Sequence, residues 1–216
     1  MIIAALLIPF ISAAAEKFKM NYTNEELPKI IESYARTSGQ KFIMDSSVRG
    51  RVTIINPTEI NQEEAYGQLS EALAINGFAI VKEGDVFLIK NARSVQRDNI
   101  EVTTTLPTMR PMRMVNWVIT LKHATAHDVM NQLRILVSAY GELSTNERTN
   151  QLFITDWSSN MQRVGELIKQ IDIPVDASTA KIAGIAKKER EARNVETKKT
   201  AAKKEMSPEA TEKSDK

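Results

Sequence analysis

The chain has 216 residues, of which 42% are hydrophobic and 26% charged, an ordinary globular composition with room for one large domain or two small ones. Its 29 basic and 27 acidic residues leave a formal charge of +2, which is too balanced to indicate nucleic acid or anionic lipid as a partner of the whole chain. The absence of cysteine excludes a disulfide framework, a thiolate nucleophile and a cysteine-based zinc site.

The first residues of the chain have the features of a secretory signal peptide. An apolar run extends from Ile2 to Ile11, well short of the ~20 apolar residues that a membrane-spanning helix needs. The pair Ala13 and Ala15 then offers the small side chains that a signal peptidase accepts. We expect residues 1–15 to be a cleaved signal peptide, with a buried N-terminal strand as the alternative.

Residues 16–90 alternate between strand and helix patterns, as a small domain with both kinds of element does. "FKMNY" alternates apolar and polar residues in the manner of a half-buried strand. "LPKIIESYARTSG" carries its apolar residues on one helical face, with a proline that the first turn tolerates and Gly39 as a natural stop. "KFIMD" and "RVTIIN" then predict two short strands joined by a turn.

The second half of this domain predicts another helix and a hairpin. Asn61 has the character of an N-cap because Glu64 follows three residues later, and the helix is expected to stop at Asn76-Gly77. The run 78–90, "FAIVKEGDVFLIK", predicts two strands joined by a turn that contains a glycine. The expected order of elements is therefore βαββαββ.

Residues 91–115 predict a linker with at most one strand. The segment is polar, carries four arginines and is interrupted by Pro107 and Pro111. Only "IEVTTT" alternates as a strand does.

Residues 116–174 predict a second domain, of order βαββα. "WVITL" favours a strand, and Thr125 is placed to open a helix. "ELS" and "QLFITD" are expected to form strands around a turn, Ser158 or Ser159 to cap the last helix, and Pro174 to end it. The fold class is thus α+β, with two small α/β-sandwich domains in tandem.

Residues 175–216 are expected to form a disordered, charged tail. They contain 9 Lys and 2 Arg against 6 Glu and 2 Asp, no aromatic residue and few large apolar ones. Such a segment buries too little apolar surface to offset the entropy of ordering it, although transient helix is expected around residues 182–193.

No pattern in the sequence supplies the residues of an enzyme. His123 and His127 are four apart but fall on different elements, and no glutamate follows as a zinc protease motif requires. The chain has no Gly-x-Ser-x-Gly elbow and no phosphate-binding glycine loop. It also lacks the Gly-x-x-Gly loop with which KH domains clamp RNA. We therefore expect no catalytic residue, no metal and no cofactor.

Several phrases, in this order of elements, resemble the periplasmic N-terminal region of outer-membrane secretins, the ring-forming channels of type II secretion. "FIMDSSVRGRVTI" and "LAINGFAIVKEGDVFLI" resemble the short domain that secretins share with TonB-dependent signalling receptors. "RTNQLFITD" and the closing "IDIP" resemble the KH-like ring domain of secretins. A secretin continues into further ring domains and a β-barrel, whereas a charged tail follows here, so we do not expect this chain to form a channel by itself.

The resemblance implies a structural role for the polar residues of the second domain. Arg148 and Asn150 would turn the chain into the following strand, with Asn150 bonding to local backbone. Asp156 or Ser158 would cap the final helix, and Pro174 would close the domain.

The resemblance also implies a partner for the first domain, which in the family meets an inner-membrane component through sheet contacts. The candidate surfaces are "FKMNY", with Lys19 and Asn21, and "RVTII", with Val52 and Ile54.

The expected function is that of a periplasmic interaction component of a secretin-type system, serving type II secretion or a type IV pilus-like system. Its expected partners are a secretin or inner-membrane secretion proteins, in a homo- or hetero-oligomer, with no nucleic acid or small-molecule substrate and only indirect outer-membrane association. An adaptor for TonB-type signalling and a cytoplasmic KH-like RNA binder are the alternatives.

Overall fold

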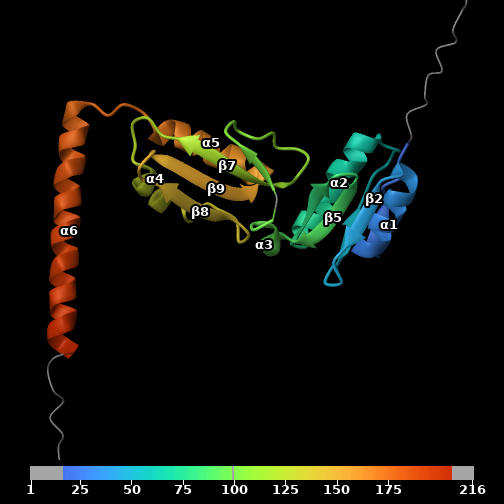
Figure 1. The fold of residues 1–216 in the computed structure, drawn as a ribbon, viewed down its shortest axis with the longest axis horizontal. Helices are drawn as coiled ribbons and strands as arrows, with labels where there is room; N and C mark the ends of the chain where they lie inside the picture. The colour runs from blue at the N-terminus through green and yellow to red at the C-terminus, as the bar shows by residue number, and fades with distance from the viewer. Residues whose placement is uncertain (1–16, 99, 206–216) are drawn as a thin grey trace, which may run out of the picture. The chain divides into compact units, whose positions relative to one another are not determined.

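The computed structural model describes residues 17–98 and 100–205 of the chain. The chain divides after Asp172 into two compact units. The unit up to Asp172 contains two α+β domains in series (Figure 1), as the sequence predicts. Residues 1–15, the predicted signal peptide, lie outside the described residues.

The first domain has the expected order βαββαββ. Its strands form two small sheets: an antiparallel pair of β1 and β3, and a sheet of order β2-β5-β4 in which β2 and β5 are parallel. The elements are β1 (Tyr22–Glu26), α1 (Leu27–Ser38), β2 (Lys41–Met44), β3 (Arg51–Ile54), α2 (Gln62–Ile75), β4 (Phe78–Glu83) and β5 (Val86–Asn91).

The helix boundaries of this domain follow the signals in the sequence. α1 carries its proline in the first turn and ends at Gly39, whose φ of 67° is left-handed. α2 begins with a capping box, in which the Asn61 side chain accepts the N–H of Glu64 at 2.9 Å and the Glu64 carboxylate accepts the N–H of Asn61 at 3.3 Å. The chain leaves α2 through Gly77, at a φ of 80°.

The strand expected at "FKMNY" is displaced towards the C-terminus. Phe18 makes only an isolated bridge to Ile60, and the first strand begins at Tyr22. Phe18 and Met20 are both buried, so the alternation in the sequence reports side chains that face the core. The ladder partner β3, however, is opposite Tyr22 and the residues that follow it. Periodicity identified the buried side chains but not the backbone pairing.

The core of the first domain contains a cluster of aromatic rings. Tyr34 stacks on Phe18 at a centroid distance of 5.3 Å and meets the edge of Phe42 at 5.7 Å. Phe87 stacks on Phe42 at 5.2 Å and lies 5.9 Å from Tyr66. Burial raises the pKa of the Tyr34 hydroxyl to about 12, which keeps this ring uncharged. The cluster is a packing feature of the fold.

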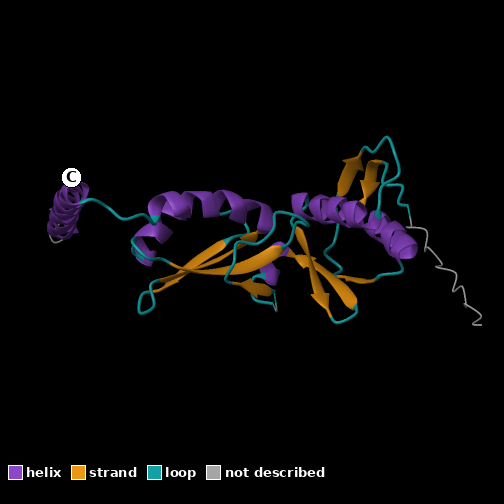
Figure 2. Ribbon diagram, turned by 90° about the horizontal axis from the view of Figure 1, so that it is seen from above, coloured by secondary structure: helices purple, strands orange, loops and turns teal. Residues whose placement is uncertain are grey.

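The second domain has one sheet of order β6-β7-β9-β8, with the predicted βαββα order running from β7 to α5. α4 and α5 cover one face of this sheet (Figure 2), where their apolar side chains meet those of β7 and β9. The elements after β5 are α3 (Ala92–Val95), β6 (Glu101–Thr103), β7 (Met114–Thr120), α4 (Ala126–Leu133), β8 (Glu142–Asn146), β9 (Gln151–Trp157) and α5 (Ser158–Ile171).

The segment predicted as a linker is more ordered than expected. It contains the short helix α3, and the strand β6 joins the second sheet in parallel with β7. Val95 on α3 is fully buried. Because most residues of this segment are polar, its composition does not reveal the few buried apolar residues that hold these elements in place.

The start of α5 corrects the predicted cap. Its N-cap residue is Trp157, which makes no side-chain capping bond. Ser158 is fully buried, and its hydroxyl accepts the N–H of Arg113 and donates to the carbonyl of Met109. The serine therefore fixes the loop before β7 instead of capping the helix, and Asp156 is also used elsewhere.

Asp156 is a fully buried carboxylate at the end of β9. It accepts hydrogen bonds from the N–H and the hydroxyl of Ser138, from the side-chain amide of Asn160 and from the N–H of Trp157. A Cβ atom at Gly141 would lie 2.9 Å from this carboxylate, so a side chain there would displace it. Asp156 thereby binds the loop before β8 to the start of α5.

Asp172 performs a similar function at the end of α5. Its carboxylate accepts the backbone N–H groups of Lys122, His123 and Ala124 at 2.6–3.0 Å, and so fixes the loop after β7. Partial burial alone would raise the pKa of the Asp172 carboxyl. The hydrogen bonds from the three N–H groups have the larger combined effect, so the pKa lies below the ordinary value for an aspartate. Asp172 thus joins the end of α5 to the loop after β7.

A third apolar cluster joins the two domains. Ala79, Val81, Ala92 and Val95 from the first half pack against Met114 and Trp157 from the second. Tyr140 meets Trp157 edge-on at 6.2 Å, and its carbonyl accepts a hydrogen bond from Gln96. The two domains keep separate cores, with this smaller cluster between them.

The tail differs from the expected disorder, because residues 177–205 form the helix α6 (Ala177–Glu205). Its Ala, Lys, Glu and Arg residues have high helix propensity although they cannot form a core. Asp176 precedes the helix and accepts the N–H groups of Ser178 and Thr179; hydrogen bonds from these residues lower the pKa of its carboxyl. Of the helices in the described residues, none is long and apolar enough to cross a membrane.

Replacing Asp156 by alanine should destabilise the protein. The half-buried donors of Ser138 and Asn160 and the buried N–H of Trp157 would lose their acceptor, which we expect to cost about 2–4 kcal/mol in the free energy of unfolding. Urea denaturation followed by tryptophan fluorescence measures this change. The matched control is Glu166→Ala, which breaks only an exposed ion pair with Lys169. Equal midpoints for the two variants would contradict the structural role of Asp156.

The stabilising effect of Asp172 should depend on pH. Because its pKa is lowered on folding, the carboxylate contributes its full stability above the unfolded pKa and loses it as the pH falls towards the folded value. The difference in unfolding free energy between wild type and Asp172→Asn should therefore be constant above about pH 5 and shrink below about pH 4. Denaturation curves across this range test the prediction, and a difference that persists at low pH contradicts it.

Candidate protein-interaction surface

The two-stranded sheet of β1 and β3 is the candidate interaction surface of the first domain. Tyr22 pairs with Ile54 and Glu25 with Val52, with an irregular register between these pairs. Each strand has only one partner among the described strands, so each presents an unpaired edge of backbone N–H and carbonyl groups. Such edges are the usual sites where an extended segment of another protein is added to a sheet.

The sequence-predicted residues Lys19, Asn21, Val52 and Ile54 do not share one face. Lys19 and Asn21 are exposed and lie in the irregular stretch before β1. Val52 and Ile54 are half-buried and pack against the core of the first domain. Any contact that a partner makes at the last two positions therefore involves their backbone.

Polar side chains hold this sheet in shape. Asn24 has a positive φ of 49°, and its N–H donates to the hydroxyl of Thr53 at 2.9 Å. Arg51 donates from Nε to the carbonyl of Asn24 at 2.9 Å and pairs with Glu26 at 3.1 Å. The N–H of Glu26, and then Lys29, lower the pKa of the Glu25 carboxyl. The sheet is thus fixed by local polar contacts that sequence patterns do not reveal.

In the second domain, Asn150 fixes a loop distant in sequence. Its φ is 50°, and its side-chain amide donates to the carbonyls of Leu121 and Ala124 while its oxygen accepts the N–H of Ala126. These partners lie 24 to 29 residues away, so the bonds are not the local ones that were expected. Asn150 therefore joins the turn before β9 to the start of α4.

The other predicted structural residues lie on the surface. Arg148 is exposed in the turn between β8 and β9, and Pro174 is exposed after α5. Neither side chain makes a hydrogen bond or an ion pair with another residue in the described part of the chain.

The two histidines do not form a metal site. His123 lies in the loop after β7 and His127 in α4, and both are exposed. His127 Nδ1 is 3.9 Å from a carboxylate oxygen of Glu147. Within residues 17–98 and 100–205, no group of three or more potential ligands is placed to hold a metal ion.

Sequence reasoning missed a second surface, the sheet face of the second domain that α4 and α5 leave uncovered. Side chains alternate along the strands, so Val118 and Phe153, paired across β7 and β9, point away from the helices. Both are half-buried and belong to none of the apolar clusters of the described residues. Val102 on the edge strand β6 is 66% exposed. The alternation in "WVITL" shows that its side chains point to two opposite faces. The sequence does not show which face the helices cover, so it does not identify the uncovered one.

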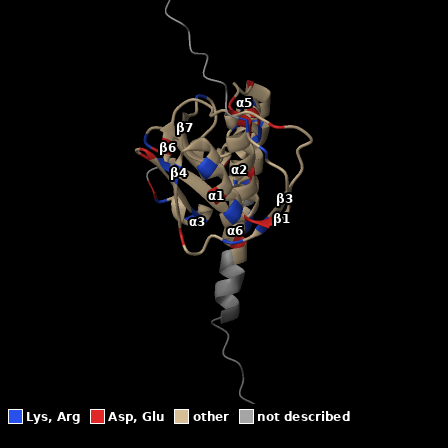
Figure 3. Cartoon of the chain, turned by 90° about the vertical axis from the view of Figure 1, so that its right-hand side faces the viewer, with Lys and Arg blue, Asp and Glu red and all other residues tan. Residues whose placement is uncertain are grey.

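The charged residues of the chain do not favour one sign of partner. Basic and acidic positions are interspersed over the described part of the molecule (Figure 3). This distribution is consistent with the formal net charge of +2. We therefore expect a partner to recognise particular surfaces and not the net electrostatic field of the whole chain.

Comparison with known proteins identifies both domains. Residues 20–89 match the model of the GspD-like N0 domain, and residues 116–177 match that of the bacterial type II/III secretion system short domain. The secretin XcpQ of Pseudomonas aeruginosa is 25% identical over 153 residues, which cover 71% of this chain and 22% of XcpQ. The secretin PulD of Klebsiella pneumoniae is 25% identical over 185 residues, or 84% of this chain and 28% of PulD.

A solved structure has the same arrangement of elements. The outer membrane complex of the Klebsiella pneumoniae type II secretion system, which contains PulD, PulS and the PulC HR domain, matches with a TM-score of 0.63 at 21% identity. The match covers 71% of this chain and 26% of the solved chain. This chain therefore spans about a quarter of the length of these relatives. It belongs to the secretin family and contains two domains of the N-terminal region of such a protein, a GspD-like N0 domain followed by the type II/III secretion short domain.

Proposed function

We propose that the chain acts in the periplasm as an interaction component of a type II-like secretion system, after export directed by residues 1–15. The observation that carries this proposal is the presence of the N0 domain and the short secretion domain in series on one chain. A TonB-type adaptor would require only a domain of the first kind.

The sheet of β1 and β3 is the proposed docking surface for an inner-membrane secretion protein. Its unpaired edges offer backbone hydrogen bonds, and the exposed side chains of Lys19 and Asn21 lie beside them. The solved type II secretion complex contains the HR domain of PulC beside PulD, which supports a partner from the secretion system.

The uncovered face of the second sheet is the proposed surface for packing between copies. Val118 and Phe153 offer apolar area that no helix covers, in a domain small enough to gain stability from a neighbour. Side-to-side packing on this face would leave the β1–β3 sheet available to the inner-membrane partner.

Site-specific photo-cross-linking tests the first surface. Benzoylphenylalanine at Lys19, Asn21 or Thr53 should capture an inner-membrane secretion protein in cells that carry the system. The control is the same label at Arg148, which is equally exposed but lies in the second domain. Absence of capture from all three positions, or equal capture from Arg148, would contradict the proposed surface.

Charge introduced on the uncovered sheet face should weaken self-association. Val118→Lys would place an ammonium in the proposed contact, which we expect to weaken association at least about tenfold. Sedimentation equilibrium gives the association constant. The control Ile135→Lys alters an apolar residue that is 87% exposed, and it should leave association unchanged. An equal effect of both substitutions would exclude this face as the contact.

A further inference from the structure

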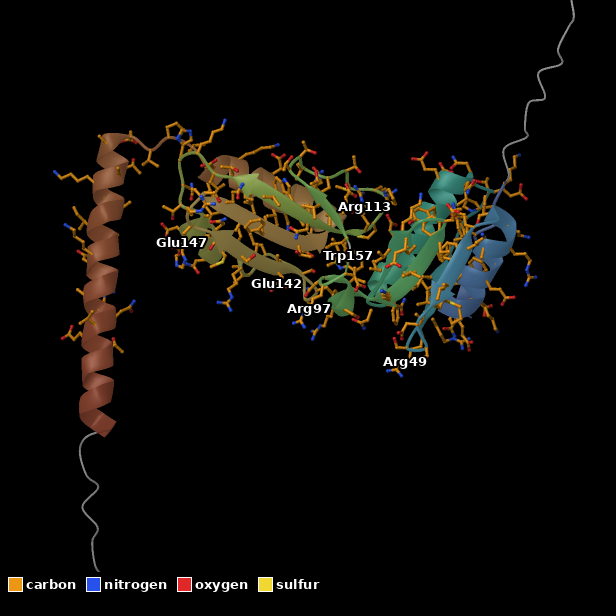
Figure 4. The ribbon with its side chains drawn as sticks, in the orientation of Figure 1. Arg49, Arg97, Arg113, Glu142, Glu147 and Trp157 are labelled. Carbon is orange, nitrogen blue, oxygen red and sulfur yellow. The ribbon has the colours of Figure 1, made fainter. Side chains whose placement is uncertain are left out.

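The joint between the domains carries a shallow cleft with an excess of positive charge. The cleft has a volume of about 640 Å³ and is lined by Arg93, Gln96 and Arg97 on one side and by Gly141 and Glu142 on the other. Arg97 at α3 and Glu142 at the start of β8 lie near one another in Figure 4. We refer to this hollow as the arginine cleft.

The arginine cleft continues into a neighbouring hollow of about 470 Å³. The second hollow shares Gly141 and Glu142 with the first and adds Arg134 from the end of α4. The continuous surface thus has three arginines against one glutamate. The excess of two positive charges is local, because the chain as a whole is nearly balanced.

The arginines of this surface are available for a partner. Arg93, Arg97 and Arg134 are exposed, and none of them forms an ion pair among the described residues. By contrast, Arg110 pairs with Glu71 at 3.1 Å and Arg113 pairs with Glu101 at 2.9 Å. Arginines at the same joint that serve the fold are therefore already paired with carboxylates.

The lining of the arginine cleft is tied to the rest of the molecule by half-buried hydrogen bonds. The Gln96 side chain donates to the carbonyl of Tyr140, and the N–H of Tyr140 donates to the hydroxyl of Ser138. Ser138 is in turn bound by the buried carboxylate of Asp156. Hydrogen bonds that fix the lining before a partner arrives reduce the entropy lost on binding, which favours specific docking.

An unpaired strand edge begins at the same place. β8 starts at Glu142, inside the cleft, and it is the last strand of its sheet, paired only with β9 among the described strands. A second polypeptide could therefore extend the sheet along β8 while its side chains reach the arginines. The strand edge suits an extended peptide backbone, and the arginines suit carboxylate side chains on that peptide.

From these observations we infer that the arginine cleft and the edge of β8 form a docking site for an extended acidic peptide segment of a partner protein. Guanidinium groups recognise carboxylates in planar, paired geometry. Glu142 makes the site less suited to a dense polyanion such as nucleic acid, because it places a negative charge among the arginines. The site is separate from the β1–β3 sheet, so it could be occupied at the same time.

Fluorescence anisotropy with labelled peptides tests this inference on the full chain. The probe is an alternating Glu-Thr peptide of about eight residues, long enough to pass β8. It should bind, and the double substitution Arg93→Glu, Arg97→Glu should weaken binding at least about tenfold. The matched control Arg49→Glu makes a charge change of the same kind at an exposed loop of the first domain, and binding should stay within about twofold of wild type.

Two further probes separate the possible occupants. A Lys-Thr peptide of equal length should not bind, and N-methylation of every residue in the Glu-Thr peptide should abolish binding because strand addition requires the N–H groups of alternate residues. Circular dichroism of each variant verifies that it is folded. The inference is overturned if the Glu-Thr peptide fails to bind, if Arg49→Glu is as harmful as the double substitution, or if an oligothymidine competes as well as the acidic peptide.

Discussion

The packing of Trp157 and Met114 against Ala79, Val81, Ala92 and Val95 is the contact that makes one unit of two small domains. Each domain has its own apolar core, but domains of this size bury only about 60% of their unfolded surface and are marginal alone. A shared cluster adds apolar burial to both without merging them. It also fixes the place of α3, from which Gln96 reaches Tyr140. The arginine cleft, which is lined from both sides of this joint, therefore depends on a small apolar cluster.

Two carboxylates, the buried Asp156 and the half-buried Asp172, fix loops at opposite ends of the second domain. Asp156 binds the loop before β8 to the start of α5, and Asp172 binds the loop after β7 to its end. Both accept several N–H or hydroxyl donors, an arrangement that stabilises the charged form of a carboxylate. The loops that connect strands and helices are consequently as well fixed as the sheet, which suits a domain whose function is to present surfaces to other proteins.

Much of the fold could be predicted from the sequence because local signals and burial agree. The Asn61–Glu64 capping box, the Gly39 stop and the hairpin after Gly77 are each determined by neighbouring residues. The displaced first strand, α3 and the cap of α5 were missed for a common reason. Each depends on a partner distant in sequence, such as Ile60 for Phe18 or Met109 for Ser158. Local patterns cannot specify such pairings.

The candidate surfaces were predicted less completely than the fold. The sequence located the β1–β3 region, but it could not show that Val52 and Ile54 face inward while Lys19 and Asn21 do not. The uncovered sheet face and the arginine cleft arise only when helices and domains are placed. A cluster such as Arg93, Arg97 and Arg134 extends over 42 residues of sequence, where it resembles ordinary solvated charge.

Gly77 links local backbone geometry to the spacing of the domains. It ends α2 with a φ of 80°, and a Cβ atom there would lie 2.5 Å from the hydroxyl of Tyr140. Tyr140 in turn rests on Trp157. A side chain at Gly77 would therefore have to displace the end of the Tyr140 side chain. A bulkier residue at this point would push the Tyr140 ring away from the end of α2 and so disturb its edge-on contact with Trp157 in the second domain.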